Sequence, residues 1–168
     1  MAKSKIYLLD TMVLINFAER CESIDLFEYF NKIGIRFLIV EEVEKEFRRG
    51  IKPLGQLRYE KHTKNGMIEI IPNDAIEIDV EKMEHLVNRG FNKGELFSSL
   101  YFVHKDNIEF VSDEKLVQKI FKEKFKYDIV RTYNLLQILV ESGAITGEEE
   151  EQIFAELIRN GLWIKVPG

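Results

Sequence analysis

Short apolar runs of strand type alternate with segments of helical periodicity along almost the whole chain, and this alternation limits the fold more than any other feature. The strand-type runs lie at residues 6–9, 35–40, 67–71, 108–111 and 127–130, and a further extended piece is expected at 162–166. Strands that alternate with helices favour a parallel sheet with helices on both faces. We therefore predict an α/β fold of three layers, α/β/α, around a central, mostly parallel sheet.

Helical periodicity fills the intervals between these runs. The expected helices lie at residues 12–18, 23–32, 41–49, 53–64, 79–89, 93–104, 114–125, 132–142 and 147–160. Ser23 is the predicted N-cap of the second helix, and Gly34 is its predicted end. No internal repeat or long linker interrupts the chain of 168 residues, which is long enough to bury a core. A single domain over residues 1–168 is expected.

Composition restricts the setting in which the chain works. The one cysteine, Cys21, excludes an internal disulfide and a cysteine-based zinc site. No apolar stretch approaches membrane-spanning length, and the N-terminus reaches an acid before a signal-peptide core can form. We expect a cytoplasmic protein without a membrane partner. The net charge of −5 argues against a generic nucleic-acid coat, but basic residues are concentrated between positions 48 and 64.

Four acidic residues border apolar runs that should form the core: Asp10, Glu46, Glu95 and Asp113. Asp10 and Asp113 each follow a predicted strand, and ligands of parallel α/β sheets bind beyond the carboxyl ends of the strands. An ionised carboxylate is costly to remove from water unless it is paired. A cluster of such groups favours a bound cation, and ligands that are all oxygen suit Mg²⁺ or Mn²⁺ and not zinc.

Each acid also has a structural explanation. Asp10 and Asp113 can cap the helices that follow them, and Glu95 can interact with the dipole of its helix. Glu46 can pair with a neighbouring arginine, and Glu42 can take its place in a site. The hypothesis of a common site therefore depends on the convergence of acids that follow different strands.

The order of these acids, in the segments DTMVLINF, VEKEF, GEL and SDE, resembles the PIN-domain family of metal-dependent ribonucleases. The segments VRTYNLLQILVESGAI and LIRNGLWI are similar to a toxin-like, VapC-type branch of that family. The resemblance implies a PIN-like fold, Mg²⁺ or Mn²⁺ held by Asp10, Glu95 and Asp113, and Glu46 as the fourth catalytic acid. It also implies cleavage of RNA, with a protein antitoxin as a further partner.

Two features depart from the family pattern. Ser98 and Ser99 stand where a second acid often follows the third one, and Arg131 or Tyr133 stands where a small residue is common. The alternative hypothesis is therefore a PIN-fold protein with weak or no catalysis that binds RNA or acts as a scaffold. A phosphatase of the haloacid type is disfavoured because no second aspartate stands two residues after Asp10.

The favoured hypothesis is an endoribonuclease in which four further residues contact the substrate: Thr11, Arg48, Arg49 and Lys52. The basic segment that contains the last three would reduce the repulsion between RNA and an acidic protein. A solvated helix surface explains the same segment. Apolar residues of the helices at 23–32 and 132–142 can support a homodimer, and core packing explains them as well.

Overall fold

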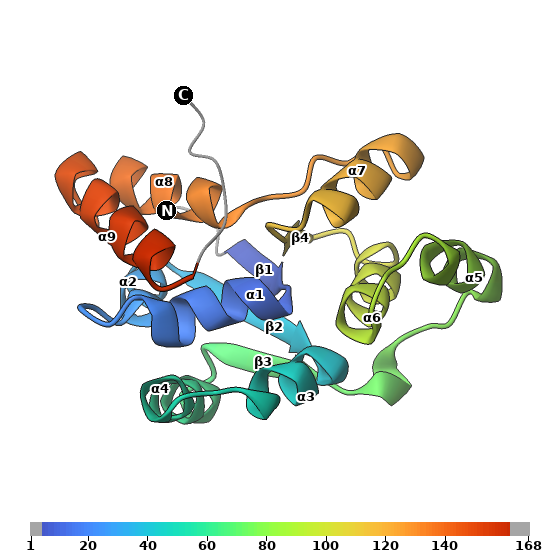
Figure 1. Cartoon of the computed structure of the whole chain (residues 1–168), viewed down its shortest axis with the longest axis horizontal. Coiled ribbons are helices and arrows are strands. Elements are labelled where there is room, and N and C mark those ends of the chain that lie inside the picture. The colour runs from blue at the N-terminus through green and yellow to red at the C-terminus, as the bar shows by residue number, and fades with distance from the viewer. Residues whose placement is uncertain (1–4, 162–168) are drawn as a thin grey trace.

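The computed structural model describes residues 5–161, which form a sheet of four parallel strands wrapped by helices (Figure 1). The strands are β1 (Lys5–Leu9), β2 (Ile35–Val40), β3 (Ile68–Ile71) and β4 (Ile108–Val111). Their order in the sheet is β3-β2-β1-β4, and every pairing is parallel. The predicted three-layer α/β/α fold is confirmed.

The helical elements match most of the predicted segments in position. They are α1 (Thr11–Ile15), η1 (Asn16–Arg20), α2 (Leu26–Lys32), α3 (Glu41–Arg49), α4 (Pro53–Lys64), η2 (Asn73–Ala75), α5 (Val80–Asn88), α6 (Lys93–Phe102), α7 (Lys115–Lys124), α8 (Thr132–Glu141) and α9 (Gly147–Arg159). None of the helices among residues 5–161 is both long and apolar enough to cross a membrane.

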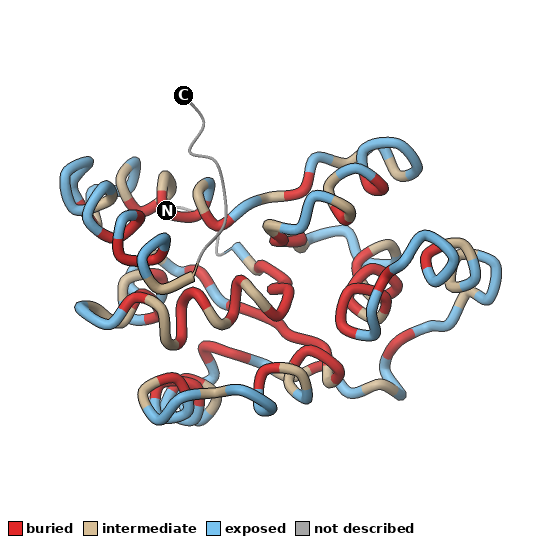
Figure 2. The backbone as a smooth tube through the Cα atoms, viewed as in Figure 1, coloured by how far each residue is buried: buried red, intermediate tan, exposed pale blue. Residues whose placement is uncertain are grey.

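An aromatic cluster fixes one face of the sheet against η1 and α2. Phe37 of β2 lies with its ring centroid 5.8 Å from Phe17, 5.8 Å from Phe27 and 5.3 Å from Phe30, and all four rings are fully buried. Buried residues therefore run along the central strands in Figure 2. Their apolar area is the main contribution to the stability of this half of the fold.

A second aromatic cluster covers the opposite face. Phe110 of β4 lies 5.8 Å from Phe102 of α6 and 5.5 Å from Phe121 of α7, measured between ring centroids. Both helices begin beside the carboxyl edge of the sheet: α7 starts at Lys115, shortly after β4 ends, and the first turn of α6 contains Gly94, which contacts Glu46. Packing on this face therefore positions the first turns of α6 and α7 near that edge.

Three local predictions are wrong. Residues 127–130 do not form a strand; a single parallel bridge joins Val130 to Val111. Asp25, and not Ser23, caps α2, because the Ser23 hydroxyl and N–H both donate to Glu156. The helix predicted from residue 12 changes after α1 into the π-helix η1. The piece expected at 162–166 lies outside the described residues.

Part of the basic segment is internal. Arg58 is 8% exposed and donates to the carbonyl groups of Cys21 at 2.6 Å and Glu22 at 3.1 Å. His62 of the same segment is 1% exposed, and its Nε2 lies 2.7 Å from the Asp25 carboxylate. These two residues stabilise the contact between α4 and the chain around residues 18–25. They are not available to RNA.

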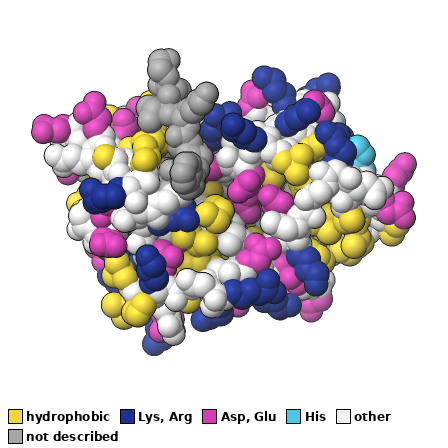
Figure 3. All heavy atoms as spheres, in the orientation of Figure 1, with side chains coloured by type: hydrophobic (Ala, Val, Ile, Leu, Met, Phe, Trp, Pro, Cys, Tyr) yellow, Lys and Arg dark blue, Asp and Glu magenta, His cyan; other side chains and the backbone are white. Residues whose placement is uncertain are grey.

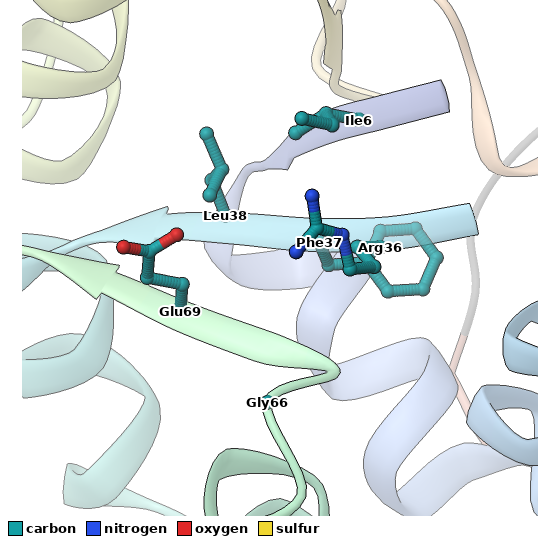
Figure 4. Close-up of a pocket in the computed structure, with 6 residues that line it drawn as sticks. All are labelled: Ile6, Arg36, Phe37, Leu38, Gly66 and Glu69. Carbon is teal, nitrogen blue, oxygen red and sulfur yellow. The ribbon is translucent and has the colours of Figure 1, made fainter. Parts of the chain in front are cut away.

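A shallow hollow of about 20 Å³ opens on the sheet at the amino-terminal half of the strands (Figure 4). Its lining includes Ile6, Arg36, Leu38 and Glu69. The hollow lies away from the carboxyl ends of the strands, where the four predicted acids are located. It is therefore separate from the candidate site.

Phe37→Ala should lower the free energy of unfolding by about 3–5 kcal/mol, since it removes the ring at the centre of the aromatic cluster. Leu57→Ala is the matched control, because Leu57 is 66% exposed and its loss should change stability by less than about 0.5 kcal/mol. Urea unfolding of both variants measures the difference. Equal losses would contradict the assigned core.

Candidate carboxylate site

Acidic side chains gather where β1 and β4 end, beside α1, α3, α6 and α7. Asp10 follows β1 directly, and its N–H donates to the carbonyl oxygen of Val111 at 3.0 Å, which holds it against the end of β4. Asp113 follows β4 by two residues. Figure 3 shows acidic side chains in the middle of this face, over the place where these helices approach one another, with Lys and Arg side chains around them.

Asp10 is the most deeply buried of the four predicted acids, at 3% exposed. Its Oδ1 accepts the N–H of Thr11 at 2.8 Å, and its Oδ2 accepts the Ser112 hydroxyl at 2.7 Å. The pKa of Asp10 is raised from its ordinary 3.8 to about 7, mainly by burial and also by the negative charges of Glu95 and Glu114, while these two hydrogen bonds oppose the rise. Asp10 caps α1, as one explanation held, but capping does not account for its burial beside other acids.

Glu46 reaches across from α3 to two other helices. Its Oε2 accepts the Thr11 hydroxyl at 2.6 Å, and its Oε1 accepts the N–H of Gly94 at 3.0 Å. The alternative in which Glu46 pairs with an arginine is therefore wrong. Glu42, its suggested substitute, instead accepts hydrogen bonds from Lys45 and Asn73.

Glu95 lies in the first turn of α6 and completes a capping box. Its Oε1 accepts the N–H of Asn92 at 3.0 Å, while its own N–H donates to Asn92 Oδ1 at 2.9 Å. Burial raises the pKa of the Glu95 carboxyl, with contributions from Glu114 and Glu46 that the hydrogen bond from Asn92 opposes. Among the described residues, no donor reaches Glu95 Oε2. That oxygen is free to bind a ligand.

Asp113 is held by hydrogen bonds from η1 and α8. Its Oδ1 accepts the N–H of Thr132 at 2.9 Å, and its Oδ2 accepts the Thr132 hydroxyl at 2.6 Å and the Asn16 amide at 3.4 Å. Burial raises the pKa of Asp113, while Thr132, Arg131 and Arg20 lower it. Asp113 therefore caps α8, which begins at Thr132, and not the helix that follows it in sequence.

Sequence reasoning missed several residues that shape the site. The negative charge of Glu114 raises the pKa of both Asp10 and Glu95. Ser112 joins the two loops, because its hydroxyl donates to Asp10 and accepts the N–H of Glu114 at 3.2 Å. Gly94 was missed because its contribution is a backbone N–H and the lack of a side chain. In the sequence, the only signal that could have pointed to Glu114 is its position directly after Asp113 in the segment SDE.

The chemistry of these donors fits a divalent cation. All of them are oxygen atoms, and in the part of the chain that the structure describes no lysine or arginine forms a salt bridge with Asp10, Glu46, Glu95 or Asp113. Over residues 5–161, no three His, Cys, Asp or Glu side chains are arranged as a complete metal-binding group. Mg²⁺ commonly needs only one or two carboxylates, since it keeps several of its waters.

The predicted substrate contacts differ in their availability. Thr11 is 8% exposed and its hydroxyl is used by Glu46. Arg48 lies 3.7 Å from Glu44 and packs over the Tyr59 ring. Arg49 and Lys52 are exposed. Of the four residues, these last two have the most accessible charges.

The parallel sheet places the chain among the α/β proteins that bind their ligands beyond the carboxyl ends of the strands, which is where these carboxylates lie. A family model described as a PIN domain matches residues 6–167. The chain therefore belongs to the PIN-domain family, whose members are generally nucleases. No curated protein matches the chain.

Gly94→Ala should displace the Glu46 carboxylate, because a Cβ atom at this position would lie 2.7 Å from Oε2 and 2.9 Å from Oε1 of Glu46. The matched control is Gly147→Ala in the first turn of α9, where nothing lies within 4 Å of the added Cβ. The control should gain up to about 1 kcal/mol from helix propensity. Gly94→Ala should lack this gain, since it loses the hydrogen bond to Glu46. Equal gains in urea unfolding would contradict the contact.

The pKa of Asp10 also predicts how stability depends on pH without metal. Between about pH 4 and pH 7 the native state keeps a proton on Asp10 that the unfolded chain has released, so the free energy of unfolding should fall as the pH rises. The slope for one proton is ~1.4 kcal/mol per pH unit. Asp10→Asn keeps an oxygen for Thr11 and removes this contribution.

The measurement is urea unfolding of the wild type and Asp10→Asn in chelator across that pH range. The stability of the variant should fall less steeply than that of the wild type. Parallel curves for the two proteins would show that Asp10 is ionised throughout.

Proposed function

We propose that the chain is a metal-dependent endoribonuclease with its active site at the carboxyl edge of the sheet. The observation that carries this proposal is the buried Asp10 carboxylate beside Glu95 and Glu114, with no cationic side chain in salt-bridge contact with Asp10 or Glu95 among the described residues. Buried negative charge of this kind is costly unless a cation neutralises it. Membership of the PIN-domain family, together with the all-oxygen donors, supports Mg²⁺ or Mn²⁺ as that cation.

Asp10, Glu95 and Asp113 would hold the ion, directly or through water. A bound Mg²⁺ or Mn²⁺ ion would supply Lewis-acid activation of a phosphodiester and of an attacking water. Glu46 would orient that water, because its carboxylate is fixed by Thr11 and by the backbone of α6.

Exposed basic residues support RNA as the substrate, and two of them lie beside this edge. Lys115 is exposed at the first turn of α7, immediately after the acidic loop, and Arg131 is exposed beside Asp113. Arg49 and Lys52 are exposed at the end of α3 and the start of α4. Such residues would bind phosphates and make the affinity for RNA dependent on salt concentration.

Asp10→Asn and Asp113→Asn should each lower the rate of RNA cleavage in Mn²⁺ by about 100-fold or more, since even outer contacts of a metal site contribute about 10–100-fold. The control is Glu148→Gln, an exposed acid on α9 that should leave cleavage unchanged. The assay follows cleavage of a labelled single-stranded RNA. Full activity in either aspartate variant would refute the assignment.

A calorimetric scan separates catalysis from metal binding. Mn²⁺ should raise the melting temperature of the wild type, because a ligand that binds only the native state stabilises it. A shift without RNA cleavage would favour an RNA-binding or scaffold protein that keeps the fold.

A toxin role is a further proposal that rests on the sequence resemblance. Its test is whether expression of the chain arrests growth and whether a co-expressed antitoxin relieves that arrest.

A further inference from the structure

Ser98 of α6 is a fully buried residue whose hydroxyl has no hydrogen-bond partner among residues 5–161. Ser99, its neighbour, is equally buried but donates to the carbonyl oxygen of Glu95 at 2.6 Å. An unpaired buried hydroxyl lowers stability, because it has given up its hydrogen bonds to water. A serine at this position therefore needs an explanation that Ser99 does not.

The geometry of the helix places Ser98 between Gly94 and Glu95 when α6 is viewed along its axis. With 3.6 residues in each turn, Ser98 lies about 40° around the axis from Gly94 and about 60° from Glu95, so it falls between them. Side chains of a helix lean toward its N-terminus, which directs Ser98 onto the turn that contains these two residues. Gly94 faces Glu46, since its N–H donates to that carboxylate at 3.0 Å.

A free donor and a free acceptor therefore lie one helical turn apart. The donor is the Ser98 hydroxyl, and the acceptor is Oε2 of Glu95, which no described residue reaches with a hydrogen bond. They do not bond to each other directly. One water molecule that accepts from Ser98 and donates to Glu95 would satisfy both groups, in the way that buried waters usually bridge polar atoms.

We infer that Ser98 is a positioning residue of the carboxylate site and that it orients the free oxygen of Glu95 through a bridging water molecule. This inference rests on the proposed function, because it assigns to Glu95 the task of holding the cation. The hydrogen bond from Asn92 fixes one oxygen of Glu95, and the water on Ser98 fixes the other. The two together restrict the rotation of the carboxylate and keep it directed toward Asp10.

The test compares Ser98→Ala with Ser99→Ala by isothermal titration of each protein with Mn²⁺ in the absence of RNA. Ser98→Ala should weaken Mn²⁺ binding about tenfold, the lower end of the effect of removing an outer hydrogen bond from a metal site. In chelator the same variant should change its melting temperature little, because it loses only a water-mediated hydrogen bond to Glu95. Ser99→Ala should melt lower and keep the affinity of the wild type for Mn²⁺.

Unchanged Mn²⁺ affinity in Ser98→Ala would overturn the role of Ser98 and leave the cation site intact. A wild type that binds no Mn²⁺ would overturn the cation site, and with it this role. A high-resolution crystal structure of the metal-free protein gives a second measurement that does not depend on binding. Electron density for a water within hydrogen-bond distance of Ser98 Oγ and Glu95 Oε2 is expected, and its absence would refute the bridge.

Discussion

The buried carboxylate of Asp10 is the interaction on which the carboxyl edge of the sheet depends. Asp10 directly follows β1 and caps α1 by accepting the N–H of Thr11. It also accepts the hydroxyl of Ser112 from the loop after β4. These contacts join two neighbouring strands at the point where both stop. They also hold a carboxyl group in a place from which water is largely excluded, so ionisation of Asp10 carries an electrostatic cost there. A cation would offset that cost, and this links the architecture of the sheet to the chemistry we propose.

Each acid of the site also has a structural task. Glu95 closes the capping box of α6, Asp113 caps α8, and Glu46 connects α3 with α1 and α6. Capping and catalysis are therefore not alternatives in this protein. The hydrogen bonds that a helix terminus supplies are the same bonds that hold each carboxylate in a defined orientation, and oriented carboxylates are what a metal-dependent site requires.

The sequence was sufficient for the parts of the fold that depend on local pattern. Alternating apolar runs and helical stripes predicted the parallel sheet, and the positions of Asp10 and Asp113 after strands predicted the edge at which they lie. The partners of Asp113 could not be predicted, because Thr132 and Asn16 are far from it along the chain. Burial of Arg58 was missed for a similar reason. Its guanidinium binds backbone carbonyl groups, which leave no mark in a pattern of side chains.

The sequence predicted that Asp10 and Asp113 follow neighbouring strands, but it did not predict the surroundings of the four acids. Glu46 and Glu42 lie one turn apart on the same helix, and composition alone does not distinguish them. Only the approach of α6, whose Gly94 lacks a side chain, leaves space for the carboxylate of Glu46. The contribution of Glu114 comes from long-range charge, which a motif does not record.

The π-helix η1, which continues α1, sets the separation between Asn16 and Arg20. Asn16, at its start, donates to Asp113 and Thr132, and Arg20, at its end, donates to Asn16 at 2.9 Å. A π-helix has more residues in each turn than an α-helix, so deleting one residue here would change the position of Arg20 relative to Asn16. The charge of Arg20 lowers the pKa of Asp113, so the number of residues between positions 16 and 20 affects the charges around Asp113. Insertions or deletions there should be tolerated less well than substitutions.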